Sequence, residues 1–495
     1  MKRLKVTHLA SSILAVLMLL SGPSGDARAQ VLPEGFSVLN VSGQLGRNAT
    51  AFALLPDERI LIANQTTGDV QLVVNGSLRP TPLVTVPDIL WSGEQGLLGI
   101  AVDPDFPDSN YVYVFHTRMD SVNRVSRYTV EGDLTDPSSD SLAIDGTSQR
   151  TIYDIPDEKT YHNGGTLRFG SDKTLYISSG EDNKFEVSQD LTSPLGKILR
   201  INRDGSIPPD NPTFYPEPEG KLEEIFAMGF RNPFRFCIDP KTDELFIGDV
   251  GPEDVEELNL SRGGENFGWP RYVANELYRA ETPLATSDST FPIHSYPHAS
   301  GRRAVIALLT YRERESLDDA SFPPEYDGVH FFADFFAGPV QYLKPDGNGG
   351  WEVVDFATGF SRPVDAAQGA DGSMYVLEYG KAVRKIVYRR SSVATEPDQT
   401  LPKRSLTLRQ NYPNPFSTFT HFTYESGRAG VTSLSIFNVL GERIATVDRG
   451  IEQPGVHTIE WDGRGDNGLP LPTGAYLYRV TSGGETQSRM MLVVR

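Results

Sequence analysis

Apolar and polar residues alternate in short runs along most of the chain, which is the pattern of β-strands with one buried face. A clear example is residues 166–180, where TLRFG and TLYISSG flank the tight turn SDK and so predict a β-hairpin. Apolar residues at helical spacing are nearly absent, apart from a weak helix candidate at residues 221–228. The pattern therefore predicts an all-β protein.

The same strand–turn–strand unit recurs along the first four fifths of the chain, with irregular spacing because long loops intervene. Repeated β-meanders of this kind are typical of radial or linear repeat folds, and six four-stranded units in about 360 residues favour radial packing around a central channel. We therefore predict a six-bladed β-propeller over residues 30–388, with function carried by the loops at one end of the channel. The copies lie at residues 52–63, 100–116, 167–180, 236–251, 326–335 and 366–380.

The pattern changes near residue 389. Residues 389–408 are mostly polar, contain proline and lack an apolar period, which is typical of a linker. Residues 409–495 return to short alternating strands, about seven of them in fewer than ninety residues. This spacing predicts a small Ig-like β-sandwich as a second domain.

Residues 1–29 have the pattern of a signal peptide. Three basic residues stand among the first five, residues 9–20 are apolar, and Ala27-Arg28-Ala29 forms a small-x-small cleavage site. The apolar run is too short to span a bilayer comfortably, and no later run is longer. We therefore expect an exported protein without a membrane span.

Charge and cysteine content narrow the possible partners. The formal net charge is −19, from 46 basic and 65 acidic residues, which argues against nucleic acid or anionic lipid as a ligand. The single cysteine, Cys237, excludes an internal disulfide, and its place in the apolar run RFCID predicts an inert core residue.

His162 stands directly before Asn163, Gly164 and Gly165 at the entrance of the predicted hairpin. Histidine is a base that is neutral near pH 7, which suits proton abstraction. Glycines let something large approach the backbone closely. We therefore expect His162 to meet a ligand.

The C-terminal part resembles the type A sorting domain of the type IX secretion system. The matching stretches are NYPNPFSTFTHFTY (411–424), SIFNVLGERIATV (435–447), WDGRGDNG (461–468) and LPTGAYLYRV (471–480). The resemblance implies export to the periplasm and then passage to the cell surface or medium, with the secretion machinery as partner of this domain. An ordinary Ig-like accessory domain is the alternative.

The propeller resembles the soluble glucose/sorbosone dehydrogenase family. This implies a six-bladed propeller that uses pyrroloquinoline quinone and calcium to oxidise aldoses. The matching stretches are GEQGLLGIAVDPDF (93–106), YHNGGTLRFG (161–170), LGKILRINRDGSIPPDNP (195–212), IFAMGFRNPFRF (225–236), VGPEDVEELN (250–259), GGENFGWP (263–270) and RPVDAAQGADGSMYVLEY (362–379).

The resemblance also implies roles for single residues. His162 matches the catalytic base, and Arg231 matches the arginine that stabilises negative charge on the quinone. Asn232 matches a cofactor contact, and Arg362 matches an arginine that pairs with the cofactor's carboxylates.

The same resemblance places the calcium ion. Gly251 and Pro252 match positions whose backbone carbonyls bind it. The acidic residues that follow are expected to form a solvated face, with the binding of a second structural ion as the alternative; they are Glu253, Asp254, Glu256 and Glu257.

Four positions depart from the glucose-oxidising pattern. Glu94 replaces a glutamine, unless Gln95 reaches in its place, and Tyr161 replaces an aspartate. Phe335 stands nearest to an expected lysine, and Val364 replaces the second of two arginines. These changes weaken the neutralisation of an anionic cofactor.

The prediction is a secreted, quinone-dependent dehydrogenase that oxidises the anomeric hydroxyl of an aldose to a lactone and passes electrons to an external acceptor. One alternative is a non-catalytic propeller that binds carbohydrate or protein and has lost the cofactor. Another is a calcium-dependent lactonase, which would need several carboxylates on one ion.

Overall fold

The computed structural model describes ten stretches of the chain, separated by short gaps and one longer gap. They are residues 30–46, 48–215, 217–252, 254–298, 301–314, 320–389, 406–411, 413–438, 443–482 and 485–495. The predicted signal peptide and most of the predicted linker lie outside them. The chain divides into two compact units, Met1–Ser391 and Ser392–Arg495.

The described residues contain strands and two short 3₁₀ helices, η1 (Phe185–Gln189) and η2 (Pro324–Tyr326), so the all-β prediction is confirmed. The weak helix expected at 221–228 is wrong, because Ile225–Met228 forms strand β14. No helix within the described stretches has the length and apolarity needed to cross a membrane.

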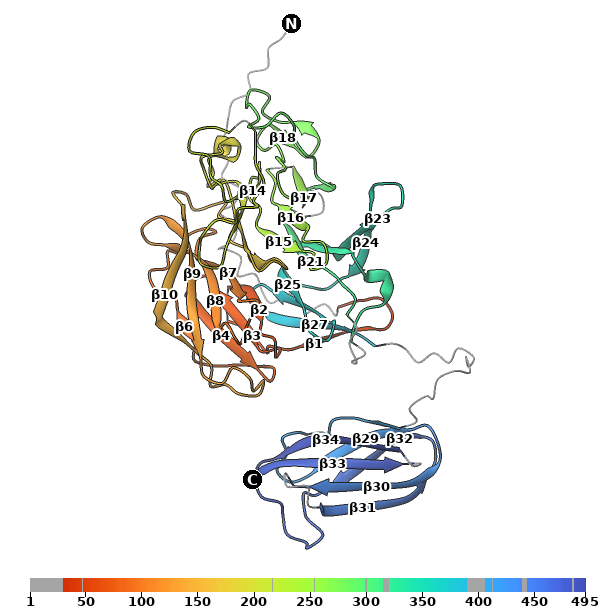
Figure 1. The fold of residues 1–495 in the computed structure, drawn as a ribbon. Helices are drawn as coiled ribbons and strands as arrows, with labels where there is room; N and C mark the ends of the chain where they lie inside the picture. Colours follow the sequence, from red (N-terminus) through yellow and green to blue (C-terminus); the bar gives the residue numbers. More distant parts are fainter. Residues whose placement is uncertain are drawn as a thin grey trace. The chain divides into compact units, whose positions relative to one another are not determined.

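The first unit contains six antiparallel sheets, or blades, and one separate two-stranded sheet, β18 (Tyr272–Val273) with β19 (Glu276–Leu277), in the segment that joins the last two strands of the fourth blade (Figure 1). The first three blades take their strands in sequence order. Blade 1 contains β2 (Ala49–Leu54), β3 (Ile60–Asn64), β4 (Asp69–Val74), β5 (Ser77–Leu78) and β6 (Val84–Thr85); blade 2 contains β7 (Leu97–Val102), β8 (Tyr111–Arg118), β9 (Val122–Glu131) and β10 (Ala143–Pro156); blade 3 contains β11 (Leu167–Phe169), β12 (Leu175–Ser179), β13 (Lys197–Ile201) and β14.

The next three blades complete the set, and the last one borrows a strand from the start of the domain. Blade 4 contains β15 (Arg235–Ile238), β16 (Leu245–Asp249), β17 (Val255–Ser261) and β20 (His294–Pro297); blade 5 contains β21 (Val305–Thr310), β22 (His330–Asp334), β23 (Val340–Pro345) and β24 (Trp351–Ala357); blade 6 contains β25 (Pro363–Gln368), β26 (Met374–Glu378), β27 (Ala382–Tyr388) and β1 (Phe36–Asn40).

The blades close into a ring. The first strand of each blade contacts the first strand of the next, in the order β2, β7, β11, β15, β21, β25 and back to β2. Strand β1 pairs with β27, with Phe36 opposite Tyr388, so the last blade joins both ends of the domain. Because the ring of blades is closed, no gap remains between the first blade and the last. The six-bladed propeller prediction is confirmed.

Hydrophobic layers between the blades form the core. Along β21, Val305 packs in the layer shared with blade 4, and the next residue, Ile306, packs in the layer shared with blade 6. Successive side chains of a strand point to opposite faces, so blade strands bury both faces. Cys237 is buried in the layer between blades 4 and 5, and burial raises the pKa of its thiol to about 12, as expected for an inert core residue.

One buried arginine joins the inner strands. Arg235, the first residue of β15, is 1% exposed, and its guanidinium donates hydrogen bonds to groups at the starts of five blades. The acceptors are Thr50 O (2.8 Å), Leu98 O (3.3 Å), Thr166 Oγ1 (3.0 Å), Phe234 O (3.0 Å) and Val364 O (2.9 Å).

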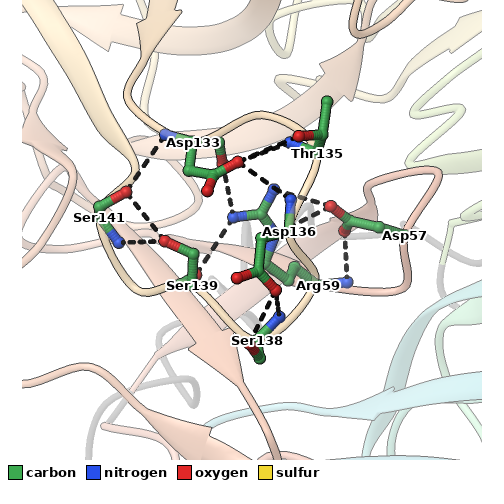
Figure 2. A network of polar contacts seen from close by, with 8 residues as sticks. All are labelled: Asp57, Arg59, Asp133, Thr135, Asp136, Ser138, Ser139 and Ser141. Carbon is green, nitrogen blue, oxygen red and sulfur yellow. Dashed lines mark hydrogen bonds and ion pairs between the residues drawn. The ribbon is translucent and has the colours of Figure 1, made fainter. Parts of the chain in front are cut away.

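A second buried arginine fixes a long loop on the rim of blades 1 and 2 (Figure 2). Arg59 forms an ion pair with Asp57 (2.7 Å) and donates to the carbonyls of Asp133 and Ser139 in the loop between β9 and β10. The carboxylate of Asp136 accepts the N–H of Ser138 at 2.9 Å, a local turn of the kind that aspartate favours. The polar loop is therefore held without a hydrophobic core of its own.

The second unit is a two-sheet sandwich. One sheet contains β28 (Leu406–Leu408), β29 (Thr420–Ser426) and β32 (Gly455–Trp461); the other contains β31 (Arg443–Glu452), β30 (Gly430–Phe437), β33 (Gly474–Ser482) and β34 (Glu485–Val493). The Ig-like sandwich prediction is confirmed. Its start was predicted too late, because Leu406 and Leu408 fall inside the predicted linker but are each 1% exposed in the sandwich core.

Replacing Arg235 should destabilise the propeller strongly. Arg235→Leu would leave several buried carbonyls without donors, at about 1–3 kcal/mol for each unsatisfied group. We expect the free energy of unfolding to fall by at least about 3 kcal/mol, measured by guanidinium denaturation followed by tryptophan fluorescence. Arg262→Leu is the control, because Arg262 is 69% exposed in its side chain. Equal stability of the two variants would contradict the role of Arg235.

Candidate active site

The predicted site residues gather at one end of the propeller. Strands alternate in direction within each blade, so the loop before the first strand and the loop between the second and third strands share an end. His162 precedes β11, Arg231 and Asn232 precede β15, and Gly251 lies between β16 and β17. The fold therefore brings together residues that are far apart in sequence.

The backbone of His162 is held in the left-handed region, at φ 65°. Its N–H donates to Glu94 Oε2 at 2.8 Å, and its carbonyl accepts the N–H of Asp182 at 3.3 Å. Such a conformation is unfavourable for a residue with a side chain, and it persists because the surroundings fix it. The side chain is 6% exposed.

The glycines beside His162 serve the chain itself. A Cβ on Gly164 would lie 2.7 Å from Ser178 O, and one on Gly165 would lie 2.6 Å from Leu98 Cβ. The sequence-based expectation that they admit a ligand was therefore incomplete, because neighbouring strands fill that space. Their effect on His162 is indirect, through the tight packing of its loop.

A buried carboxyl that the sequence analysis missed faces the imidazole. Glu181 is 0% exposed, and its Oε1 lies 2.5 Å from Nδ1 of His162. Burial raises the pKa of Glu181 to about 8. Burial, helped by the positive charge of Arg231, lowers the pKa of His162 well below 6.5. The pair therefore favours a neutral imidazole with Nε2 on the side away from Glu181.

The other oxygen of Glu181, Oε2, has no hydrogen-bond partner among the described residues, and neither has the buried Nε1 of Trp269. The indole is close enough to lower the pKa of Glu181 against the effect of burial. The acidic pair Glu181 and Asp182 at the end of an apolar strand was the available sequence signal for this residue.

Asn232 links the loop of blade 4 to the loop of His162. Its Oδ1 accepts the N–H of Gly164 at 3.1 Å, and its Nδ2 donates to Glu94 Oε2 at 3.3 Å. The buried carboxylate of Asp249 accepts the backbone N–H of Asn232 at 2.7 Å and that of Arg231 at 3.0 Å. Arg231 is half-buried, and its Nη1 donates to Val250 O at 2.8 Å.

Glu94, and not Gln95, occupies the position where the glucose-oxidising pattern has a glutamine. The Glu94 carboxylate receives hydrogen bonds from His162 and Asn232, whereas Gln95 is buried behind the site with its Nε2 2.6 Å from Asp157 Oδ2. Burial raises the pKa of Glu94, and its hydrogen bonds and the charge of Arg231 oppose that rise. The site therefore contains an extra carboxyl group.

Gly251 and Pro252 directly follow Val250, whose carbonyl accepts a hydrogen bond from Arg231, and both are partly exposed. A Cβ on Gly251 would lie 1.8 Å from Val255 O, so glycine is required there. Among the described residues, no group of three or more histidine, cysteine or acidic side chains could hold a metal ion.

The solvated face expected for the acidic run was wrong for two of its members. Glu256 is 0% exposed and accepts the N–H of Val305 at 3.0 Å, and Glu257 is 8% exposed and accepts that of Ala274 at 2.5 Å. They lie on opposite faces of β17: Glu256 faces β21 of blade 5, and Glu257 faces the segment between β17 and β20. Burial raises their pKa values to about 7 and about 8.

Arg362 reaches the site through a short relay of contacts. It is exposed, its guanidinium lies 6.0 Å from the ring of Phe335, and its carbonyl accepts the N–H of Tyr379. The hydroxyl of Tyr379 donates to Gln65 Oε1 at 2.9 Å, and Gln65 Nε2 donates to the carbonyl of Glu94 at 3.2 Å.

The remaining departures add no cation. Phe335 is 8% exposed between Arg362 and Tyr379, and Val364 is 1% exposed in the core. Tyr161 is half-buried, where a Cβ on Gly93 would lie 3.2 Å from its ring.

Comparisons with known proteins agree with this architecture. A family model described as Glucose / Sorbosone dehydrogenase matches residues 47–386. The aldose sugar dehydrogenase YliI of Escherichia coli (strain K12) is 31% identical over 340 residues, covering 66% of this chain and 86% of that protein. The second unit matches an FlgD Ig-like domain model over residues 419–485.

Solved structures show the same fold. The soluble aldose sugar dehydrogenase of Escherichia coli in its apo-form aligns with a TM-score of 0.59 and 25% identity, covering 72% of this chain and all (100%) of that one. The PQQ-bound aldose sugar dehydrogenase of Streptomyces coelicolor aligns with a TM-score of 0.56 and 24% identity, covering 72% and 99%.

These findings define the class of protein: a six-bladed propeller enzyme that oxidises sugars. The chain belongs to the glucose/sorbosone dehydrogenase family, since the family model covers more than half of it. The roles of its individual site residues and the sorting role of the second unit stay predictions.

The buried Glu181 should make stability depend on pH. Its folded-state pKa of about 8 lies above the ordinary glutamate value of 4.5, so stability falls as pH rises between those values. Glu181→Gln removes the titration while keeping the shape. We expect the melting temperature of the variant minus that of the wild type to grow by at least about 2 °C between pH 5 and pH 8.

Glu352→Gln is the matched control, because the Glu352 side chain is 54% exposed. The difference in melting temperature between this variant and the wild type should not change with pH. The titration of His162 acts in the opposite direction but only below about pH 6.5, so it does not disturb the upper half of this range. A constant difference for Glu181→Gln would show that Glu181 ionises normally.

Proposed function

We propose that the protein is a secreted dehydrogenase that oxidises the anomeric hydroxyl of an aldose to a lactone, with pyrroloquinoline quinone and calcium as cofactors and an external electron acceptor. The observation that carries the proposal is the pair of His162 and buried Glu181, with Nδ1 and Oε1 2.5 Å apart, beside the permanent charge of Arg231. This is an arrangement of a general base, a group that orients it and a fixed cation.

The residues present fit the quinone, an anionic molecule with several carboxylates. Arg231 is half-buried and Arg362 is exposed, so both guanidinium groups can face an anion. The carbonyls of Gly251 and Pro252 accept no hydrogen bond from any described residue and are therefore available to calcium, which prefers oxygen ligands. When bound, the quinone would supply the acceptor for the hydride of the sugar, which carries both electrons of the oxidation.

The extra carboxyl of Glu94 is compatible with that fit. Two hydrogen bonds satisfy it from inside the protein, and burial raises its pKa, so it adds less negative charge than an exposed glutamate would. Phe335 and Val364 carry no positive charge. Arg231 and Arg362 are therefore the two cations that we propose to face the cofactor.

His162 and its neighbours perform the proton transfer. For Nε2 to accept the proton of the anomeric hydroxyl, Nδ1 must carry its hydrogen and donate it to Glu181. Ionised Glu181 favours that tautomer, so the base gains strength as pH rises toward about 8, the pKa of Glu181. Arg231 stabilises negative charge that develops near it.

Calcium-dependent binding of the quinone is the test. We titrate the purified full chain with pyrroloquinoline quinone, with and without calcium, and follow the quinone absorbance. We expect saturable binding that is lost with a chelator, and reduction of the bound quinone on adding aldoses. No binding at micromolar quinone would overturn the proposal and favour a carbohydrate- or protein-binding propeller.

The control variant is His162→Asn. It should bind the quinone as the wild type does and keep its melting temperature, but reduce the quinone at least about 100-fold more slowly, because general-base catalysis contributes roughly 10²–10⁴-fold. A matching loss of stability would mean that His162 has only a structural role. The lactonase alternative would need a cluster of carboxylates, and none occurs among the described residues.

We further propose that residues 1–29 direct export to the periplasm and that the sandwich directs passage to the surface or medium. The sequence resemblance supports this, and the division into two units supports independent folding of the propeller.

Truncation after Ser405 tests the role of the sandwich, in a bacterium with type IX secretion machinery. We expect the truncated chain to stay in the periplasm with the melting temperature of its propeller unchanged, whereas the full chain reaches the surface or medium. Cell fractionation measures the first outcome and calorimetry the second. Secretion of the truncated chain would contradict the sorting role, and its unfolding would contradict independent folding.

A further inference from the structure

A buried carboxylate with three amide partners lies behind the active site. Asp157 directly follows β10 and is 1% exposed. Its Oδ1 accepts hydrogen bonds from Nδ2 of Asn163 at 2.6 Å and of Asn123 at 3.1 Å, and its Oδ2 accepts one from Nε2 of Gln95 at 2.6 Å. Burial raises the pKa of Asp157 to about 6 against the effect of the amides, so the group is mostly ionised at neutral pH and accepts all three bonds. These four residues are called the amide cluster below.

The amide cluster joins three segments at the active-site end of the propeller. Gln95 precedes β7 and Asn123 is the second residue of β9, both in blade 2, whereas Asn163 precedes β11 in blade 3. Each of the three is at most 3% exposed. Gln95 directly follows Glu94, and Asn163 directly follows His162. The cluster therefore holds the chain neighbours of two residues that bond to each other at the site.

The charge of Asp157 dictates how two of the amides point. Gln95 and Asn163 present their NH₂ groups to the carboxylate, so turning either amide over would bring two oxygens together. Gln95 Oε1 and Asn163 Oδ1 are buried and have no hydrogen-bond partner among the described residues. Each unpaired buried oxygen costs about 1–3 kcal/mol, and proteins accept such costs mainly where function constrains the structure. The cluster thus favours one fixed arrangement over the greatest stability.

The segment that leads from the cluster to the histidine is fixed along its length. Asp182 is 1% exposed, and its carboxylate accepts the backbone N–H groups of Glu158 at 3.0 Å and Lys159 at 2.7 Å. The carbonyl of the next residue, Thr160, accepts the N–H of Glu94 at 2.8 Å. This segment therefore cannot shift without breaking bonds to both of its neighbours.

These constraints act on the position of the imidazole. The N–H of His162 donates to Glu94 Oε2 at 2.8 Å, which requires the loops before β7 and β11 to keep one position relative to each other. Asp157 holds the first loop through Gln95 and the second through Asn163. The loops on both sides of this bond therefore depend on one carboxylate.

We propose that Asp157 is a positioning residue for the oxidation. Through its amide partners it keeps His162 and Glu94 in place relative to each other, and so sets the direction in which Nε2 of His162 meets the sugar. Its carboxylate is buried among the amides and acts through His162, without touching the sugar. This inference rests on the function proposed above, because it takes His162 as the base.

Asp157→Asn tests the proposal without changing the size of the side chain. An amide has one acceptor oxygen in place of two and adds an NH₂ group, so at least one donor of the cluster loses its partner. We record carbon–proton correlation spectra of the full chain, without quinone, with isotope-labelled histidines. The chain has eight histidines, and the signal of His162 is the one that His162→Asn removes. We expect this signal to shift in Asp157→Asn.

The kinetics should separate positioning from cofactor binding. With calcium present, Asp157→Asn should keep the wild-type dissociation constant for the quinone. At saturating aldose it should reduce the quinone at least about tenfold more slowly, because misplacing a catalytic group by about 1 Å can cost roughly 100-fold in rate. Gln95→Met removes one donor of the cluster and keeps an unbranched side chain. It should shift the same signal and slow the reaction even if Asp157→Asn fails to fold.

Asp239→Asn is the matched control. Asp239 is also 1% exposed and accepts hydrogen bonds from Arg312, but it lies between β15 and β16, at the opposite end of the propeller. Its replacement should lower the melting temperature, as that of Asp157 does. It should leave the His162 signal and the rate of quinone reduction unchanged.

A wild-type His162 signal and rate in both Asp157→Asn and Gln95→Met would overturn the proposal and leave Asp157 a structural residue. An equal shift of the signal in Asp239→Asn would also overturn it, since the loss of any buried carboxylate would then have the same effect. If the wild type itself never reduces quinone, a shift confined to the Asp157 and Gln95 variants would support the positioning and refute only the oxidation.

Discussion

The buried guanidinium of Arg235 is the interaction on which the architecture most depends. A propeller brings the inner strands of its blades side by side around a channel, where carbonyls near the strand starts face inward and need donors. Arg235 supplies them for the groups of five blades, and among the described residues no carboxylate bonds to it directly. Burial lowers its pKa to about 10, so it still carries its charge at neutral pH. One fixed cation thus sets the positions of strands from which the site loops depart.

The active site inherits that rigidity. Thr166, an acceptor of Arg235, is four residues beyond His162, and Asn232 is three residues before Arg235. The side chain of Asn232 bonds to the N–H of Gly164 and to the carboxylate of Glu94. One side chain therefore joins the loops of blades 2, 3 and 4. The unfavourable backbone conformation of His162 is maintained by this joint arrangement, which orients the imidazole before a ligand arrives.

Much of this could be predicted from sequence, and the failures have a common cause. Alternation of apolar residues sufficed for the blades, and the motifs around His162 and Arg231 sufficed to predict a shared site. Glu181 and the buried pair Glu256 and Glu257 were not recognised, because acidic residues next to polar turns usually face water. Neighbouring segments cover both faces of β17 and bury Glu256 and Glu257. The loops that carry His162 and Arg231 bury Glu181 beyond the end of β12. Sequence alternation shows the two faces but not what covers them.

The electrostatics of the site follow from the same burial. Glu94, Glu181 and Asp249 all influence or bond the groups around Arg231, and burial raises the pKa of each, to about 8 for Glu181 and about 6 for Asp249. Three ionised carboxylates would repel an anionic cofactor more than one arginine could offset. Raised pKa values let some of these groups take up protons when an anion approaches, which lowers the negative charge without a further cation. Proton uptake would then take over part of the role that the missing cations at Phe335 and Val364 leave open.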